Sequence, residues 1–200
     1  MGIQQPILLN LPMPIRTSRL LIRPLQAGDG AALFEALEES IDQLRPWLPW
    51  ARGTAPTEEE MEILARRFYV EFITRQTMNL AAFSGTQLIG MCGLKNLRWD
   101  IPSCELGYWF RTSIQRKGFA TEAVNAITRY AFSQIGIRRL VITCDDENAR
   151  SAAIPERLGF SLEMKAKGIV PPGPSSDELR LGRLYSRISL EKLPEIVVEW

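Results

Sequence analysis

The residues with the clearest capacity for chemistry lie in one short turn, residues 115–121, with the sequence Gln-Arg-Lys-Gly-Phe-Ala-Thr. A strand-like run precedes the turn at 104–110, and small or apolar residues recur at helical spacing behind it, over 120–131. The first N–H groups of a helix have no partner within the helix, and the helix dipole adds partial positive charge there. The turn therefore predicts a site for an anion, usually a phosphate group.

Basic residues and a glycine add to this prediction. We expect Arg111, Arg116 and Lys117 to bring positive charge to the mouth of the turn. Gly118 can let the backbone approach a ligand closely or adopt a positive φ. A glycine before a helix is also ordinary turn chemistry. The turn matches neither of two known phosphate fingerprints, G-x-x-x-x-G-K-[ST] and G-x-G-x-x-G.

Composition limits the classes of protein to consider. The chain has 200 residues, 46% of them apolar and 24% charged, which suits one folded domain with a substantial core. The net charge is +1, so bulk attraction to nucleic acid or anionic lipid is not expected. No apolar run reaches the roughly 18 residues of a membrane span, and the N-terminus lacks the pattern of a signal peptide. We therefore expect a cytoplasmic protein that binds neither nucleic acid nor membrane.

The absence of histidine narrows the chemistry further. Without histidine, Ser-His-Asp and Cys-His mechanisms are excluded, and the commonest metal ligand is missing. The three cysteines, Cys92, Cys104 and Cys144, fall in apolar strand-like runs and are expected to be small buried hydrophobes. The sequence therefore predicts no metal site, and proton transfer must use other side chains, water or a free amine.

The elements that position the turn follow from periodicity and from turn residues. Strand-like patterns occur before, between and after helical patterns, so that antiparallel strands surround one βαβ unit. The predicted strands are 19–25, 79–83, 87–95, 103–110, 139–144, 160–164 and 180–190, and the predicted helices are 30–40, 57–75, 117–134 and 149–158. This order predicts a mixed sheet with helices on both faces.

The motifs, taken in order, resemble those of the GNAT N-acetyltransferases. Residues 116–120, entered from Gln115, resemble the acetyl-CoA signature Q/R-x-x-G-x-G/A, and 148–151 followed by 156–160 resemble the family's next element. Residues 17–25 and 105–109 resemble the RimJ/RimL branch, which acetylates protein N-terminal amines, and 184–186 stand where that branch has a similar motif.

The resemblance covers roughly residues 16–190 and implies the fold class. That fold is α/β (α+β), with a mixed, mostly antiparallel central sheet of about seven strands, helices on both faces and a βαβ core that binds acetyl-CoA. The implied organisation is an N-terminal arm at 1–15, one N-acetyltransferase domain at 16–190 and a C-terminal tail at 191–200. Dimers are common in the family, so a homodimer is also considered.

The same resemblance implies how acetyl-CoA binds, without a metal. Its pyrophosphate would lie on the turn, and its pantetheine arm would pair like an extra strand where two strands separate. Asn148 and Ser151 would face the thioester, although Asn148 is also a good helix cap by itself. Pro155, in the middle of that helix, is expected to bend or shorten it. The implied backbone contacts are Trp109, Phe110 and Arg111 for the arm, and Arg116, Lys117, Gly118, Phe119, Ala120 and Thr121 for the pyrophosphate.

The reaction needs a base for the amine and a proton donor for the departing thiolate. Glu105 is the candidate base, because alternation along its strand places it on one face with Gly107 and Trp109, although it could instead be an ordinary salt-bridged strand residue. Ser151 or Tyr185 could supply the proton, and Ser151 is preferred.

The acceptor is the least determined partner. Trp47 and Trp50 lie in a Pro-broken loop and either form a wall of the acceptor cleft or pack beneath the loop. Tyr108 is expected in the same cleft, where its backbone N–H, or that of Trp109, could polarise the thioester carbonyl. The leading acceptor is a protein N-terminal α-amine, perhaps ribosomal. The alternatives are a small amine (a polyamine, an amino acid or an antibiotic) and a non-catalytic acyl-CoA sensor.

Overall fold

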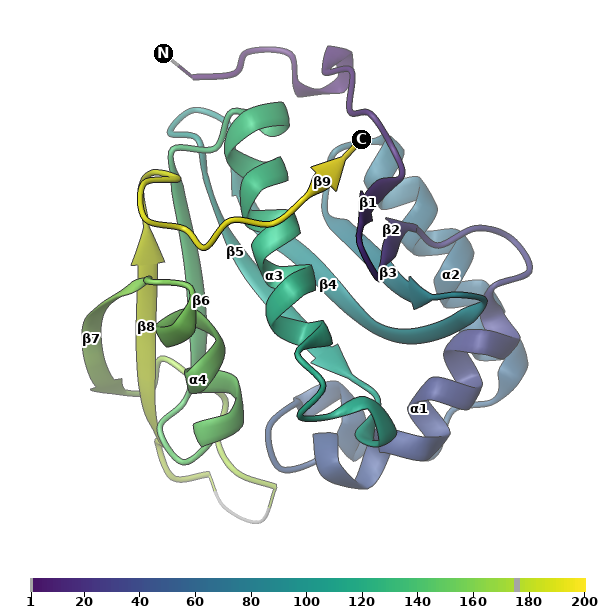
Figure 1. Cartoon of the computed structure of the whole chain (residues 1–200). Helices are drawn as coiled ribbons and strands as arrows, with labels where there is room; N and C mark the ends of the chain where they lie inside the picture. Colours follow the sequence, from purple (N-terminus) through teal and green to yellow (C-terminus); the bar gives the residue numbers. More distant parts are fainter. Residues whose placement is uncertain (1, 175–176) are drawn as a thin grey trace.

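A single sheet of nine strands organises the chain (Figure 1), with the order β7-β8-β6-β5-β4-β3-β2-β1-β9. The computed structural model describes residues 2–174 and 177–200, so Met1 of the arm and Ser175 and Ser176 of the main domain lie outside the description. Among the described strands, all neighbouring pairs are antiparallel except β5 and β6. The strands are β1 (Ile15–Thr17), β2 (Leu21–Pro24), β3 (Met78–Ser84), β4 (Gln87–Arg98), β5 (Ser103–Phe110), β6 (Arg139–Asp145), β7 (Ser161–Lys167), β8 (Leu181–Arg187) and β9 (Val198–Glu199).

Helices cover both faces of the sheet, as predicted. The buried apolar side chains of α1 and most of those of α2 form one core with β3 and β4. Those of α3 and α4, together with Phe72 of α2, form the other core with the central strands. Figure 1 shows α3 and α4 on one face and α1 and α2 beside the opposite end of the sheet. The helices are α1 (Gly30–Leu44), α2 (Glu58–Ile73), α3 (Phe119–Tyr130), which continues as a π-helical turn (Ala131–Ile135), and α4 (Ala149–Arg157), with short 3₁₀ turns at Pro6–Leu8, Pro49–Arg52 and Thr112–Ile114.

The strand count differs from the expected seven by two short edge strands. β1 pairs with β2, and β9 in the C-terminal tail pairs with β1, which extends the sheet at this edge. These strands have three and two residues, too few to show a period of two along the sequence. Strands from near both ends of the chain, β1 and β9, therefore form this edge of the sheet. Figure 1 shows the C-terminus next to β1.

The parallel pair β5 and β6 separates along its length. Ser103, Cys104 and Glu105 pair with Arg139, Leu140 and Val141, and the pairing ends there. Beyond this point β5 remains paired with β4 up to Phe110, and β6 remains paired with β8 up to Asp145. The two strands thus diverge and leave a gap in the middle of the sheet, directly before the helix α3.

Within the described residues, no helix is long and apolar enough to cross a membrane. The same part of the chain contains no group of three or more His, Cys, Asp or Glu residues that could hold a metal ion.

Candidate active site

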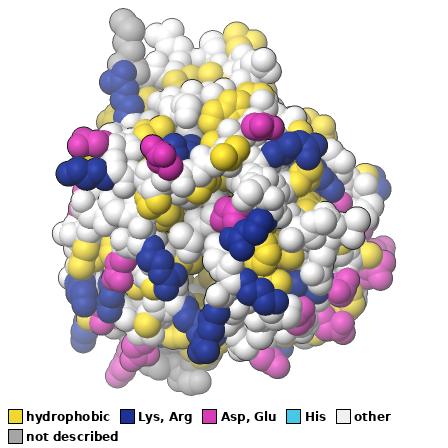
Figure 2. Space-filling model, viewed as in Figure 1, with side chains coloured by type: hydrophobic (Ala, Val, Ile, Leu, Met, Phe, Trp, Pro, Cys, Tyr) yellow, Lys and Arg dark blue, Asp and Glu magenta, His cyan; other side chains and the backbone are white. Residues whose placement is uncertain are grey.

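A cavity of about 1510 Å³ occupies the gap between β5 and β6. Its wall contains the separated ends of both strands, the start of α3 and the start of α4. Basic side chains at its edge include Arg19, Arg116, Arg150, Arg157 and Arg180. Figure 2 shows Lys and Arg side chains around a hollow in the lower half of the face in view. The cavity therefore joins the predicted anion site to the gap in the sheet.

The turn before α3 leaves backbone donors open toward this cavity. Gly118 has φ +83° and stands before the first helical residue, and among the described side chains none caps this helix end. The N–H of Glu122 donates to the Gly118 carbonyl at 3.0 Å, so the three preceding N–H groups have no helical acceptor. These groups belong to Phe119, Ala120 and Thr121, which all line the cavity. An uncapped helix end in a basic cavity suits an anion.

The basic residues near the turn take different places. Arg116 has φ +63° and lines the cavity, but Lys117 lies outside its lining. The expectation of charge at the mouth is wrong for Arg111, whose guanidinium is buried: Nε donates to the Leu88 carbonyl at 2.7 Å. Its Nη1 lies 3.0 Å from carboxylate oxygens of both Glu35 and Glu39. A bulky cation that follows a strand can anchor a neighbouring helix as well as bind a ligand, and the sequence does not distinguish the two.

Arg19 supports the turn instead, which the sequence analysis missed. Its Nη1 donates to the Lys117 carbonyl at 2.9 Å, and its guanidinium lies 4.5 Å from the centre of the Phe119 ring. It also forms an ion pair with Glu122 in the first turn of α3. No spacing rule links these residues, because they are about a hundred positions apart in the chain.

The direction of the β5 backbone decides which peptide groups face the gap. The Arg111 N–H donates to the Ile89 carbonyl on β4 at 2.8 Å. Since backbone groups alternate in direction along a strand, the N–H of Trp109 also faces β4, whereas those of Tyr108 and Phe110 face the gap. Of the three backbone positions expected to meet the pantetheine arm, Phe110 presents its N–H to the cavity.

Glu105 lies at the point where the two strands separate, and its carboxylate lines the cavity. Oε1 lies 3.1 Å from the Lys95 ammonium, and Oε2 accepts from the Asn96 amide at 3.0 Å. The side chain is 20% exposed, so water or a substrate can reach it. Glu105 is thus salt-bridged, as the second alternative from the sequence has it, and it also lines the cavity, where the role of base stays a prediction.

The start of α4 brings Asn148 and Ser151 to the opposite wall. The Asn148 side chain accepts from the Ser151 N–H at 3.0 Å, which is the predicted helix cap. The helix continues through Pro155 to Arg157. Because Pro155 has no N–H, the Ser151 carbonyl lacks its usual helical donor. The Tyr108 hydroxyl donates to this carbonyl at 2.9 Å and thereby joins β5 to α4 across the gap.

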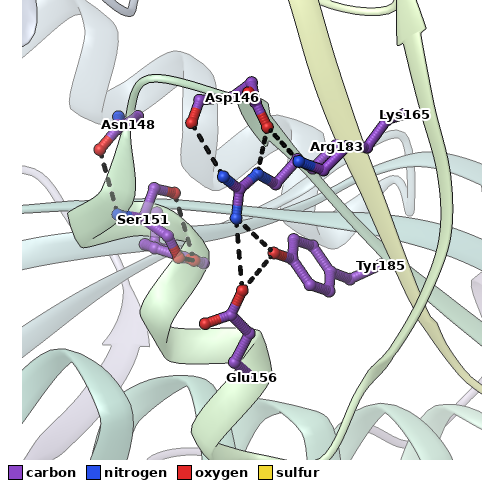
Figure 3. Close-up of polar contacts among 8 residues, drawn as sticks. Asp146, Asn148, Ser151, Glu156, Lys165, Arg183 and Tyr185 are labelled. Atoms are coloured by element: carbon purple, nitrogen blue, oxygen red, sulfur yellow. Dashed lines mark hydrogen bonds and ion pairs between the residues drawn. The ribbon is translucent and has the colours of Figure 1, made fainter.

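Tyr185 lies on the other side of α4, outside the lining of the cavity. It is buried on β8, and its hydroxyl donates to Glu156 Oε1 at 2.7 Å. Burial raises its pKa, so the hydroxyl is protonated at neutral pH. Arg183 contacts both side chains and pairs with Asp146, and Figure 3 shows this network beside the helix that carries Ser151. Of the two candidate proton donors, Ser151 is therefore the one in the cavity.

Cys144, expected only as a buried hydrophobe, lies close to Ser151 in the cavity wall. It is 6% exposed, and burial raises the pKa of its thiol to about 11. The thiol is therefore protonated at neutral pH.

The loop with two tryptophans forms the outer wall of the cavity. Trp47 and Trp50 both line it, and the Trp50 ring lies 6.3 Å from the Trp109 ring at a tilt of 58°. Arg180 lies over Trp47 at 5.2 Å and donates to the Pro46 carbonyl at 2.9 Å. The sequence analysis also missed Arg180, which contacts this loop only through tertiary structure.

A second cavity of about 480 Å³ lies between α1, α2 and the sheet. The residues that line both cavities are Leu48, Trp50, Lys95, Gly107, Tyr108 and Trp109. No sequence pattern indicated it, because the residues that form it come from six separate segments of the chain.

Comparison with known proteins gives a family match over most of the chain. The family model described as an acetyltransferase (GNAT) domain matches residues 19–161. The chain is 35% identical to Uncharacterized N-acetyltransferase YnaD of Bacillus subtilis (strain 168) over 161 residues, which are 80% of this chain and 90% of that protein. It is 31% identical to the ribosomal-protein-serine acetyltransferase of Escherichia coli (strain K12) over 81 residues, 40% of this chain and 45% of that protein.

Solved structures have the same fold. The structure of RimL, a ribosomal L7/L12 alpha-N-protein acetyltransferase in complex with coenzyme A, superposes with a TM-score of 0.79. The superposition covers 90% of this chain and 98% of RimL, at 20% sequence identity. At 20% sequence identity, this superposition shows that the two chains share a fold.

Proposed function

The chain belongs to the GNAT acetyltransferase family, and on this premise we propose that it transfers an acetyl group from acetyl-CoA to the α-amine of a protein N-terminus. The observation that carries this proposal is the arrangement around the first cavity. There, the open N–H groups of Phe119, Ala120 and Thr121 and the carboxylate of Glu105 face one space between separated strands. An acceptor of the ribosomal-protein type would place the reaction in the cytoplasm.

The residues present fit acetyl-CoA. A diphosphate needs backbone donors and positive charge, which the uncapped start of α3 and Arg116 provide. An extended arm needs unpaired strand groups, which Tyr108 and Phe110 provide on the side of the gap. Bound acetyl-CoA supplies an activated acyl carbonyl, and the remaining chemistry falls to the protein.

We assign the proton transfers to two residues on opposite walls. The acceptor reacts as the neutral amine, and Glu105 takes a proton from its nitrogen, directly or through water, as the new N–C bond forms. The C–S bond breaks, its electron pair stays on sulfur, and Ser151 donates its hydroxyl proton to the thiolate while it regains a proton from water. An N-terminal α-amine has a pKa of about 8, against about 10.4 for lysine, so it needs less help from a base. The two walls also align the reactants, which contributes to the rate.

The shape and charge of the cavities favour a polypeptide over a polyamine. Trp47 and Trp50 border the large cavity and offer aromatic surface to an acceptor. Among the described residues, no carboxylate lines the second cavity, and Lys95 lines it instead. A polyamine requires carboxylates along its length, so these walls do not suit it.

A thiol-release assay with acetyl-CoA and a panel of N-terminal peptides tests the proposal. We expect turnover, and we expect Glu105→Gln to lower kcat about 100-fold without changing the affinity for coenzyme A. Glu163→Gln is the matched control, because Glu163 is also a strand carboxylate paired with a basic side chain, Arg139, but lies on the edge strand β7. We expect it to keep full activity.

Two results would contradict the proposal in different ways. Binding of coenzyme A with no transfer to any peptide or small amine would identify a sensor. Turnover that Glu105→Gln leaves intact would remove this residue from the mechanism.

A further inference from the structure

The second cavity lies next to Glu105, the candidate base, along the strand β5. Glu105, Gly107 and Trp109 lie on one face of β5, and alternate residues on a strand are about 7 Å apart. Gly107 and Trp109 form part of the wall of the second cavity, and Lys95, the partner of Glu105, lines it as well. A group attached to an amine at Glu105 can therefore extend directly into this cavity.

Two glycines face each other in the floor of this cavity, and one of them leaves open space. Gly93 on β4 pairs directly with Gly107 on β5, and both face the cavity. A Cβ at Gly107 would meet only Lys95 Cε, at 3.9 Å, so the space above this residue is open. At Gly93 the same space is taken by the Asn79 side chain, whose Oδ1 would lie 2.7 Å from an added Cβ. The open part of the floor is thus at Gly107, next to Glu105.

The remaining wall is apolar. Leu33 and Leu37 from α1 and Met61, Leu64 and Phe68 from α2 form most of it. Among the described residues, Lys95 is the charged group that lines it, and no carboxylate does. A cationic occupant would lose its hydration without gaining a partner, whereas an apolar occupant would gain contacts. At about 480 Å³ the cavity lies within the usual range for small ligands, so it can hold a side chain as large as Phe.

We propose that this cavity is a specificity pocket for the side chain of the residue whose α-amine is acetylated. The enzyme then prefers acceptors that begin with a large apolar residue, such as Leu, Met or Phe, over those that begin with Gly, Ala or Ser. This inference rests on the proposed function, because it assumes that an α-amine lies at Glu105. It adds a class of acceptor, which neither the family nor the first cavity determines.

The test measures kcat/KM for peptides that differ only in their first residue, with thiol release and product mass as readouts. We expect Leu, Met and Phe to exceed Ser by at least about tenfold, a modest value for several methylene groups in an apolar pocket. Amides of the same amino acids form a second arm, which distinguishes a polypeptide acceptor from a free amino acid derivative. Equal or greater activity with Gly, Ala or Ser would overturn the inference. If no acceptor of either kind reacts although coenzyme A binds, the proposed function itself fails.

Gly107→Ala tests the pocket directly, because its methyl group enters the open floor. We expect the ratio of kcat/KM between Leu-first and Ser-first peptides to fall at least fivefold. Gly53→Ala is the matched control: its Cβ would meet nothing within 4 Å, Gly53 lines neither cavity, and the ratio should not change. An unchanged ratio in Gly107→Ala would overturn the inference.

A second variant keeps the test independent of the strand backbone. Leu64→Glu places a carboxylate on the half-buried wall provided by α2. We expect this variant to lose activity toward Leu-first peptides and to gain activity toward Lys-first peptides, relative to the wild type. Retention of the wild-type order would show that Leu64 does not contact the acceptor, contrary to the inference.

Discussion

The two halves of the candidate site are built in different ways. On the proposed cofactor side, the groups that would meet a ligand are mostly backbone: the N–H groups that open α3 and the unpaired edge of β5. On the acceptor side, the walls are side chains from the loop at 45–56, from α1 and α2, and from Trp109. A backbone site depends on where elements begin and end, whereas a side-chain site depends on which residues tertiary structure brings together.

This difference explains how the two sides can serve one reaction. A backbone site tolerates change in its side chains, so a family can keep one cofactor while its sequences diverge. A site made of side chains changes its preference with each substitution, so the acceptor can differ between relatives. The predictions below test whether the cofactor side does depend on backbone geometry.

Among changes on the cofactor side, the largest effect on binding is expected at the turn. Gly118 has φ +83°, a conformation that a β-branched residue adopts only with strain, so Gly118→Val should displace the N–H groups that follow it. We expect the dissociation constant for coenzyme A to rise at least about tenfold, equivalent to about 1.4 kcal/mol, as measured by calorimetry.

The control for Gly118→Val lies at the other end of the same helical segment. Gly136 has φ +81°, and a Cβ there would lie 3.8 Å from Ile3 Cδ1, so Gly136→Val introduces similar backbone strain far from the cavity. We expect both variants to lose thermal stability, but only Gly118→Val to lose affinity. If Gly136→Val weakens binding equally, the effect is general destabilisation and the turn has no special role.

The same distinction separates what the sequence could predict from what it could not. The turn at Gly118 and the cap at Asn148 follow from local spacing, because each depends on neighbours within a few residues. The divergence of β5 and β6 was expected only from the family resemblance, because these strands lie on either side of α3 in the chain. The second cavity, the Arg180 contacts and the buried place of Arg111 depend on residues tens of positions away. The sequence does not predict β1 and β9 for a related reason. Each is too short to have a recognisable pattern and is a strand because it pairs with a neighbour in the sheet.

A smaller effect is expected for the proton donor, which tests whether a side chain matters on the cofactor side. A thiolate is a fair leaving group even without protonation, so we expect Ser151→Ala to lower kcat only about tenfold, below the usual range for a general acid. Tyr185→Phe should change kcat less than twofold, because the Tyr185 hydroxyl is bound to Glu156 outside the cavity. Single-turnover measurements would separate this step from product release. The reverse pattern would transfer the role to Tyr185.

The smallest effect concerns the contact across the gap, and it is measured as stability. Tyr108→Phe removes the donor to the part-buried Ser151 carbonyl, which Pro155 leaves without a helical partner, and a hydrogen bond of this kind contributes about 0.5–1.5 kcal/mol. For a chain of this size we expect Tm to fall by about 2–4 °C for each kcal/mol. Adding Pro155→Ala restores an N–H to the helix, so the double variant should recover most of the loss, whereas two independent effects would simply add.

Tyr130→Phe is the matched control, because the buried Tyr130 hydroxyl has no hydrogen-bond partner among the described residues, and its removal should leave Tm unchanged or raise it. Recovery in the double variant would show that this part of the cofactor side is held together by a backbone carbonyl, as the comparison of the two halves requires.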